Sequence, residues 1–588
     1  MMRGLRIALV EATLPLAALM GTTILVFGEG WTRMHSLVIG GGNAVTPSDV
    51  NGTMWFYWWV SQAQARGADM VVPDVICAPT GQALGSNFPQ HIDALMAAPL
   101  MANLPTPMAF NLFACLIPVM GGMAAFLAAR WLKVGWVGAM LVAILFGFNS
   151  LSMHELANGK PPSAMMFTMP LFVGAWIKSL TAEGPKAWAW MIGAGLAAAL
   201  AIQHYVLYAL VLAFFGAGTL LLFALRPARG QTRRRAVVAG LVVLTTGVLV
   251  ASPYLNKLLS DRRPMPAATT LKLTDPAVVR EAKESIDVGY LFGVDEDESL
   301  PRRAAFPTVL TFAALLLIPF GGRRSRRWIV AGVGFYLLSL GPMAAVSVRP
   351  EVEWMTIAGR GVPLPTWWLN TVFPFSIQFF HPCRVFPMVV LCMGLGVAHG
   401  LAHIGRSRGL AMFAPALSAL TAVIGMWQVN KQGGLHLLTA DWTPHAFFSS
   451  LAEAEEPGAL LEFPVGLGHA TAPFQLVHGW DRSESHHDNI AGLKTNQRPD
   501  DCFQLPIFDD LWAMSRGDTQ ALPSEADVIE ARAAGFQYLV VYRAGFDVLN
   551  QAGIDVDREM SIRALARALG EPQINDDTLV VFALESGS

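Results

Sequence analysis

The chain is poor in charged residues: 14% of its 588 residues are Asp, Glu, Lys or Arg, against about 25% in a typical soluble domain. Hydrophobic residues make up 53%, and the mean hydropathy is +0.44. The formal net charge is −2, so there is no overall positive field to attract nucleic acid. The composition therefore argues against both an ordinary soluble domain and a nucleic-acid partner.

Cysteine is also scarce, and its spacing is uninformative. The five cysteines form no CxxC pair and no other metal-ligand spacing: Cys77, Cys115, Cys383, Cys392 and Cys502. Paired spacings of this kind are typical of zinc ribbons and of disulfide frameworks. We therefore expect neither a zinc ribbon nor a disulfide-stapled domain.

Long apolar runs, by contrast, are abundant. At roughly 20 residues for each span, the sequence predicts about eleven transmembrane helices, near 6–27, 107–129, 135–153, 163–180, 187–203, 205–225, 236–255, 306–320, 328–347, 385–404 and 410–430. The first follows a basic lead and lacks a small-residue cleavage site, so we interpret it as a retained anchor. We expect a tight turn at Gln203, His204 and Tyr205, between the fifth and sixth spans.

The distribution of Lys and Arg predicts the orientation. With a cytoplasmic N-terminus, the inner connections are basic, whereas the short outer ones hold almost no Lys or Arg apart from Lys160. This is the positive-inside pattern of membrane proteins. An odd number of spans then places the longer segments 28–105, 257–305, 348–384 and 431–588 on the outer face, where we expect the chemistry to occur.

The last 158 residues have a different pattern from the preceding ones. Short β-branched runs alternate there with stretches of helical spacing that close on a glycine: strands near 460–465, 538–543 and 579–584, helices near 524–535 and 557–570. Such alternation favours a small α/β domain. We therefore predict a polytopic α-helical membrane domain, 1–430, followed by a soluble extracytoplasmic α/β domain, 431–588.

The stretch 45–62 holds a single acid, Asp49, followed by the aromatic run from Trp55 to Trp59. Because Trp and Tyr prefer the membrane–water boundary, we interpret 51–62 as an interfacial helix lying on the bilayer; a substrate-stacking platform is the alternative. A carboxylate at the start of such a helix is a candidate general base. Asp49 could instead be an N-cap of the helix.

Other polar residues gather at the predicted outer helix ends. They are His91, Asp93, His154, Glu155, Lys160, His204, Tyr205, His381 and Arg384. Because ionisable groups at the membrane boundary are costly unless they pair or face a wet cavity, we predict that these residues line an outward-opening, substrate-binding cavity. Two alternatives stay open: His154 and Glu155 could satisfy each other, and Arg384 could bind the phosphate of a lipid headgroup.

With these residues in place, the chain resembles the GT-C class of integral membrane glycosyltransferases, and in particular bacterial members with a C-terminal extracytoplasmic domain. The resemblance rests on Asp49 with its aromatic helix, on the loop PTGQALGSNFPQHIDALMAAPL at 79–100 and on SIQFFHPCRVFP at 376–387. It implies a bacterial inner-membrane enzyme that transfers a sugar from a polyprenyl-phosphate donor to a glycan, lipid or protein acceptor. It also implies that Asp49 activates the acceptor and that Arg384, with His381, holds the donor phosphate.

One departure from the family bears on metal dependence. Members that need a metal carry acidic pairs in their outer loops, whereas Asp49 stands alone and Asp93 is the remaining candidate for a second acid. We therefore expect no metal and no other cofactor, with a divalent cation as the alternative.

Two further functions compete with the enzyme: a transporter or flippase of a lipid-linked saccharide, and a non-catalytic membrane assembly protein. A transporter would place polar groups at mid-membrane, whereas here they lie at helix ends. The enzyme interpretation requires Asp49 and Arg384 to line one outward-opening cavity.

Overall fold

The computed structural model describes residues 2–40, 47–70, 72–78, 81, 91–224, 230–260, 272–283, 285–286, 307–347, 352–358, 360–372, 381–407, 413–431, 435, 439–455, 458–467, 474–479, 481–483, 493–494 and 504–584. The chain forms two compact units that interleave along the sequence. Unit 1 comprises Met1–Thr32, Pro89–Asp93 and Asn111–Leu438, and unit 2 comprises Arg33–Phe88, Ala94–Phe110 and Thr439–Ser588. The first outer loop, predicted to belong to the transmembrane domain, is grouped for the most part with the C-terminal residues in the structure.

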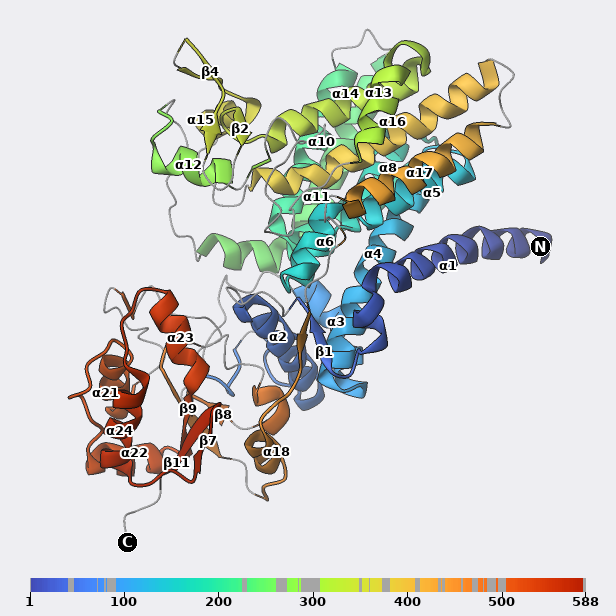
Figure 1. Cartoon of the computed structure of the whole chain (residues 1–588). Coiled ribbons are helices and arrows are strands. Elements are labelled where there is room, and N and C mark those ends of the chain that lie inside the picture. Colours follow the sequence, from blue (N-terminus) through green and yellow to red (C-terminus); the bar gives the residue numbers. More distant parts are fainter. Residues whose placement is uncertain are drawn as a thin grey trace. The chain divides into compact units, whose positions relative to one another are not determined.

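Unit 1 is built mainly of helices (Figure 1). Its longer helices, with α3 and α4 continuing into unit 2, are α1 (Met2–Thr32), α3 (His91–Asn103), α4 (Thr106–Trp131), α5 (Trp136–Gly147), α6 (Ser150–Ala157), α8 (Thr168–Thr181), α9 (Pro185–His204), α10 (Val206–Ala224), α11 (Gly230–Ser260), α13 (Thr308–Phe320), α14 (Gly322–Ser339), α16 (Phe386–Ser407) and α17 (Phe413–Lys431). Shorter elements complete it: α7 (Pro161–Ala164), α12 (Pro276–Lys283), β2 (Ala345–Ser347), β3 (Glu353–Trp354), β4 (Thr356–Ile357), β5 (Arg360–Gly361), α15 (Pro365–Val372) and the 3-10 turn η4 (Pro382–Val385).

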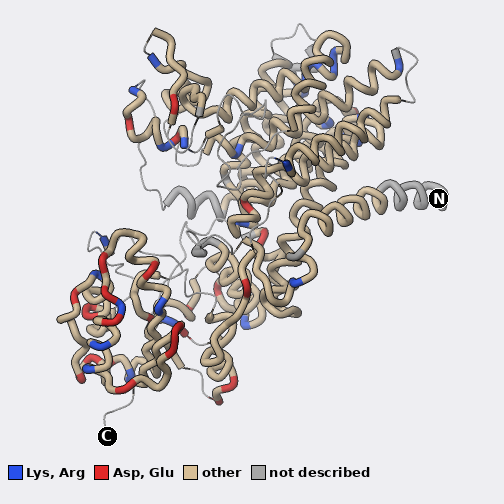
Figure 2. Tube along the Cα trace, in the orientation of Figure 1, with Lys and Arg blue, Asp and Glu red and all other residues tan. Residues whose placement is uncertain are grey.

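Six helical stretches within the described part of the chain are long and apolar enough to cross a membrane: Thr106–Trp131, Trp136–Ala157, Pro161–Thr181, Pro185–His204, Arg234–Ser252 and Pro382–Arg406. Every stretch predicted to span contains a helix, and the predicted turn between α9 and α10 is confirmed at Tyr205. Figure 2 shows long stretches of these helices without Lys, Arg, Asp or Glu. The chain is a mostly helical membrane protein.

Small residues let the helices of unit 1 approach closely. A Cβ on Gly147 of α5 would lie 2.6 Å from the carbonyl oxygen of Pro118 in α4, so no larger residue fits there without a backbone shift. Between α14 and α16, the Ser325 hydroxyl donates to the carbonyl of Gly396 at 2.7 Å. Both are typical contacts of membrane helices, which associate through close packing and interhelical hydrogen bonds rather than through the hydrophobic effect.

Unit 2 is organised around a mixed five-stranded sheet with the order β10-β11-β9-β7-β8. Its strands are β7 (Ala459–Phe463), β8 (Asp481–Arg482), β9 (Phe536–Tyr542), β10 (Ile574–Asn575) and β11 (Leu579–Ala583). β7 runs parallel to β8 and β9, and β11 runs antiparallel to β9 and β10. The three predicted strand stretches therefore correspond to β7, β9 and β11, three neighbouring strands of the sheet.

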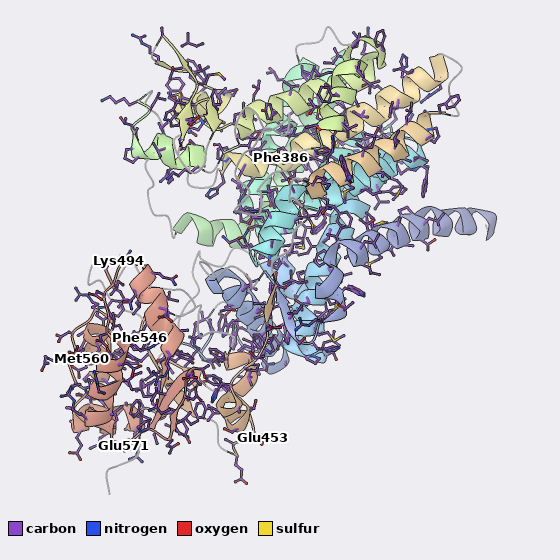
Figure 3. All side chains as sticks on the ribbon, viewed as in Figure 1. Phe386, Glu453, Lys494, Phe546, Met560 and Glu571 are labelled. Carbon is purple, nitrogen blue, oxygen red and sulfur yellow. The ribbon has the colours of Figure 1, made fainter. Side chains whose placement is uncertain are left out.

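Both faces of this sheet are covered (Figure 1). Its helices are α18 (Ala446–Ala452), α21 (Ile507–Met514), α22 (Glu525–Ala533), α23 (Arg543–Gln551) and α24 (Arg558–Leu569). Side chains alternate across β9: Leu539 and Val541 pack with α21 to α24, whereas Val540 packs with α18 on the other face. Phe546 of α23 lies in the first of these cores (Figure 3).

The two helices predicted in this region are confirmed as α22 and α24. Ser524 and Asp527 form a capping box at the start of α22, and Asp557 caps α24 by accepting from the Met560 amide. Gly570 ends α24 with a positive φ of 89°, a conformation that favours glycine.

Two sequence-based expectations for unit 2 are wrong. The aromatic residues of α2 (Pro47–Arg66) do not lie on a bilayer surface, because Trp55, Tyr57 and Trp59 are fully buried in the protein. Cys77 is disulfide-bonded, whereas Cys115, Cys383 and Cys392 are free thiols. Aromatic composition alone could not separate a membrane boundary from a protein core, and the spacing of the cysteines in the sequence did not reveal that Cys77 forms a disulfide.

Asp481 of β8 provides a pH test of unit 2. Partial burial and the nearby charge of Asp74 raise its pKa to about 6, against the opposing effect of Arg66. Its folded-state pKa is above the unfolded value, so the charged carboxylate destabilises the fold increasingly as pH rises from about 4 through 6. We expect Asp481→Asn to raise the melting temperature by roughly 2–4 °C at pH 7.5, and by less at pH 5. A gain that is equal at both pH values would contradict this.

Candidate functional site

Arg384, in η4 directly before Phe386 and α16 (Figure 3), lies at the centre of a buried polar cluster in unit 1. Its Nη2 lies 3.4 Å from Oε1 of Glu155 in α6, and the two side chains are only 13% and 6% exposed. Strong charge-assisted hydrogen bonds are shorter, at about 2.7–2.9 Å. Glu155 therefore offsets the positive charge of Arg384 without occupying all the hydrogen-bond donors of its guanidinium.

Two tyrosines form the wall of this cluster. The guanidinium carbon of Arg384 lies 4.8 Å from the ring centroid of Tyr205, a cation–π distance. The Tyr205 and Tyr208 rings are 4.9 Å apart, and the Tyr208 hydroxyl donates to the carbonyl of Ser163. The Tyr205 ring thus contacts the Arg384 guanidinium, and the Tyr208 hydroxyl anchors the tyrosine pair to the Ser163 carbonyl.

Local sequence signals bring these segments together. Asn149 caps α6 by accepting from the Ser152 amide at 3.1 Å, which starts the helix that carries Glu155. The helical conformation is interrupted at Tyr205, whose extended backbone separates α9 from α10. Pro382 occupies the first position of η4, where the missing amide hydrogen costs nothing.

Arg384 retains hydrogen-bonding capacity that the cluster does not use. Its Nε and Nη1 are buried and have no hydrogen-bond acceptor among the described residues. A guanidinium carries five N–H donors in a planar fork that matches a phosphate or carboxylate. Buried polar groups normally have partners, so these idle donors indicate a site for an anion.

Asp93 and His204 form a second pair that adjoins the first. Oδ1 of Asp93, in the first turn of α3, lies 3.9 Å from Nδ1 of His204 at the end of α9, and both side chains are fully buried. This is an ion-pair distance rather than a hydrogen bond. The His204 ring centroid is 6.4 Å from that of Tyr208. His204 therefore lies beside Tyr208, while the role in binding substrate that the sequence predicts for Asp93 and His204 stays a prediction.

The remaining candidates lie around this cluster. The Nε2 atom of His154 is 3.1 Å from the side-chain nitrogen of Asn158. Glu155 is engaged by Arg384. The Lys160 amide donates to the Glu155 carbonyl at 2.8 Å, and the Arg384 amide donates to the His381 carbonyl at 3.0 Å. All these backbone contacts belong to the turns that present Glu155 and Arg384.

The roles expected from the sequence for Asp49, as the base, and for His91, in binding substrate, stay predictions. Asp49 lies in the first turn of α2, and His91 is the first residue of α3, but their side chains lie outside the described part of the structure. Asp49 is the third residue of α2, so it sits within the first helical turn rather than at the N-cap. A shared cavity for Asp49 and Arg384 also stays a prediction. The described residues contain no group of three or more His, Cys, Asp or Glu placed to hold a metal ion.

Tyr208 and Ser163 were not among the predicted site residues. The spacing in QHYVLYAL was a signal for Tyr208, because Tyr205 directly precedes α10 and Tyr208 lies in the first turn of that helix, where its amide donates to the Tyr205 carbonyl at 2.9 Å. Ser163 contributes its backbone carbonyl, and no side-chain pattern reveals such a role.

No protein-family model and no curated protein sequence matches the chain. Among solved structures, the chain is similar to the arabinofuranosyltransferase AftD from Mycobacteria, with 15% identity and a TM-score of 0.54. The likeness covers 97% of this chain and 40% of the AftD chain, so this chain spans well under half of that protein. The chain therefore shares the fold of this arabinofuranosyltransferase, and the resemblance to membrane glycosyltransferases seen in the sequence is confirmed at the level of the fold.

Two more distant likenesses have TM-scores of 0.46. One is to the archaeal oligosaccharyltransferase AglB from Archaeoglobus fulgidus in complex with an inhibitory peptide and a dolichol-phosphate, with 12% identity over 92% of this chain and 70% of that one. The other is to ArnT from Cupriavidus metallidurans bound to undecaprenyl phosphate, with 12% identity over 98% of this chain and 99% of that one.

Proposed function

We propose that this protein is a membrane glycosyltransferase that moves a sugar from a polyprenyl-phosphate donor to a glycan, lipid or protein acceptor on the extracytoplasmic face. The observation that carries the proposal is Arg384, a buried arginine at a helix end whose Nε and Nη1 have no acceptor among the described residues. The fold shared with AftD supports the interpretation of Arg384 as part of a glycosyltransferase site.

The phosphate is the leaving group of such a reaction, so its negative charge grows in the transition state. A guanidinium fixed beforehand by Glu155 and the Tyr205 ring needs little reorganisation to stabilise that charge. Because the Glu155 carboxylate lies 3.4 Å from Nη2, the unused Nη1 donor, at the end of the guanidinium that it shares with Nη2, is assigned to the donor phosphate. The Nε donor points to the other edge and is assigned to a second hydrogen-bond acceptor. Lys160 and His381, next to the cluster in sequence, are proposed as further contacts.

The acceptor needs a base, and we assign that role to Asp49. It lies in the first turn of α2 and would take the proton of the acceptor hydroxyl as that oxygen attacks the sugar carbon. The bond from that carbon to the phosphate oxygen breaks, and the polyprenyl phosphate leaves. No metal enters this scheme, because the outer-loop sequence lacks the acidic pair of the metal-dependent members.

The proposal includes the predicted topology of about eleven spans with the C-terminal α/β domain outside. Three helices beyond the six apolar ones expose aliphatic or aromatic side chains, such as Leu222 of α10, Leu316 of α13 and Val423 of α17. Exposed apolar faces of this kind suit contact with lipid better than with water. The disulfide at Cys77 suits an oxidising compartment outside the bacterial inner membrane.

The test is a transfer assay with the purified protein in lipid nanodiscs, a radiolabelled polyprenyl-phosphate sugar and a cell-envelope extract as acceptor source. We expect label to pass from the lipid to the acceptor fraction in a time-dependent manner, with release of polyprenyl phosphate. Movement of the intact labelled lipid between leaflets without cleavage would contradict the enzyme and favour a flippase. Binding of the lipid with neither outcome would favour a non-catalytic assembly protein.

A further inference from the structure

The helix that carries Asp49 is held by the C-terminal part of the chain. Just before it, β1 (Leu37–Ile39) pairs antiparallel with β6 (Thr439–Asp441). The Arg33 guanidinium donates to the Asp441 carboxylate at 2.8 Å. These contacts tether the entry to α2 across some 400 residues of sequence.

Gln475 contacts α2 directly. It lies in the short helical segment 474–478 and is fully buried. Its side-chain oxygen accepts from the indole Nε1 of Trp55 at 2.6 Å, and its side-chain nitrogen donates to the carbonyl of Val75 at 2.7 Å. One amide therefore bridges α2 and the loop that follows it. Trp59 stacks on Trp55, with ring centroids 6.4 Å apart and planes 9° from parallel.

The loop after α2 is built into the C-terminal sheet. The Arg482 amide donates to the Val75 carbonyl at 3.1 Å, and the Ala78 amide donates to the Arg482 carbonyl at 3.0 Å. Residues 75–78 thus pair with β8, the edge strand of the sheet, and cover an edge that would otherwise be open. Cys77 and Ala78 are part of the same hydrophobic core as Leu461 of β7, and Cys77 is disulfide-bonded.

From this arrangement we infer that the C-terminal residues 439–584 form the positioning scaffold of α2, and that Gln475 is the positioning residue that sets the placement of α2. The inference rests on the proposed function, since it gives the scaffold a catalytic consequence through Asp49. Trp55 follows Asp49 by six residues, about 9 Å along a helix. A rigid helix transmits a shift at Trp55 to its own first turn.

A misplacement of about 1 Å at a catalytic group can cost about 100-fold in rate. Removing the Gln475 bridge should therefore reduce turnover without weakening the donor-phosphate site, which lies in unit 1. A helix that merely fills space in unit 2 would show no such separation of kcat from donor KM. A positioning role for Gln475 thus predicts a lower kcat with an unchanged donor KM, whereas a purely structural role does not.

The experiment compares Gln475→Leu and Trp55→Phe with the wild type in nanodiscs. We expect faster hydrogen exchange of the α2 amides in residues 50–63, and a kcat lowered by about 10- to 100-fold with an unchanged donor KM. Because each variant removes one side of the same hydrogen bond, the double variant should lose less than the sum of the two single effects. Trp55→Phe keeps an aromatic ring in the core and serves as the milder change should Gln475→Leu fold poorly.

The matched control is Asn550→Ala, which removes the two hydrogen bonds between the Asn550 side chain and the Val556 backbone at 2.9 and 3.3 Å, in the same unit but on α23 and outside the contacts of Gln475. It should lower the melting temperature while leaving kcat and α2 exchange unchanged. An equal loss of kcat in this control, or unchanged exchange and kcat in Gln475→Leu, would overturn the inference. If the wild type itself transfers no sugar, the proposed function fails, and the α2 exchange in Gln475→Leu still decides whether the scaffold exists.

Discussion

Replacing Arg384 by glutamine is expected to lower kcat/KM for sugar transfer by about 100- to 1,000-fold, the usual cost of removing one preorganised donor from a site of developing charge. Glutamine keeps hydrogen-bonding capacity but carries no charge and no planar fork. Arg384→Lys restores the charge alone and should recover only part of the rate, because an ammonium cannot bind phosphate through a bidentate fork. Initial rates with a labelled polyprenyl-phosphate sugar give the measurement.

Loss of Arg384 also leaves Glu155 buried without its cation, so stability must be separated from catalysis. The double variant Glu155→Gln/Arg384→Gln removes both charges and should recover the melting temperature of the wild type but not its activity. Arg326→Gln, at an exposed position on α14, controls for loss of a positive charge. Activity that returns in the double variant would show that Arg384 only neutralises Glu155, and the phosphate assignment would be wrong.

Asp49→Asn is expected to lower kcat by about 100- to 10,000-fold, the range of general acid–base contributions, with the donor KM unchanged. Asparagine has nearly the same shape and can cap or solvate a helix start as well as aspartate does, but it cannot accept the acceptor's proton. The substitution therefore separates a catalytic role of Asp49 from a structural role in the first turn of α2. Single-turnover rates at saturating donor give the measurement.

Asp69→Asn is the matched control, because Asp69 is an exposed acid just beyond the C-terminal end of α2. Its kcat should stay within about twofold of the wild type, as expected for a surface change away from the reacting atoms. If Asp49→Asn behaves in the same way, Asp49 has only a structural role at the helix start, and the base must be sought elsewhere.

Much of unit 1 could be predicted from the sequence because membrane helices satisfy their own backbone hydrogen bonds. Each apolar stretch therefore specifies a helix almost independently of the others, down to the break at Tyr205. Arg384, Glu155 and Tyr205 were predicted individually for the same reason, as polar residues at helix ends. Their mutual contacts at 3.4 Å and 4.8 Å could not be predicted, because helix order in a bundle depends on packing between distant segments.

Unit 2 shows the opposite case. The strands β7, β9 and β11 were predicted from local β-branched runs, but the pairing of β1 with β6 was not, because strand pairing joins residues hundreds of positions apart. The aromatic run of α2 looked like a membrane anchor for a related reason. The local sequence is the same whether an indole donates to Gln475 in a protein core or to water at a bilayer surface.

The sequence by itself determined that this is a multi-span helical membrane protein with a cation and several polar groups at the helix ends, because hydropathy and charge act within a few residues. Tertiary structure alone decided that the first outer loop and the C-terminal residues fold as one unit, and that Arg384 is left with unused donors beside Glu155 and Tyr205. The physical reason is that such placement results from long-range packing and hydrogen bonding, for which a local pattern carries no signal.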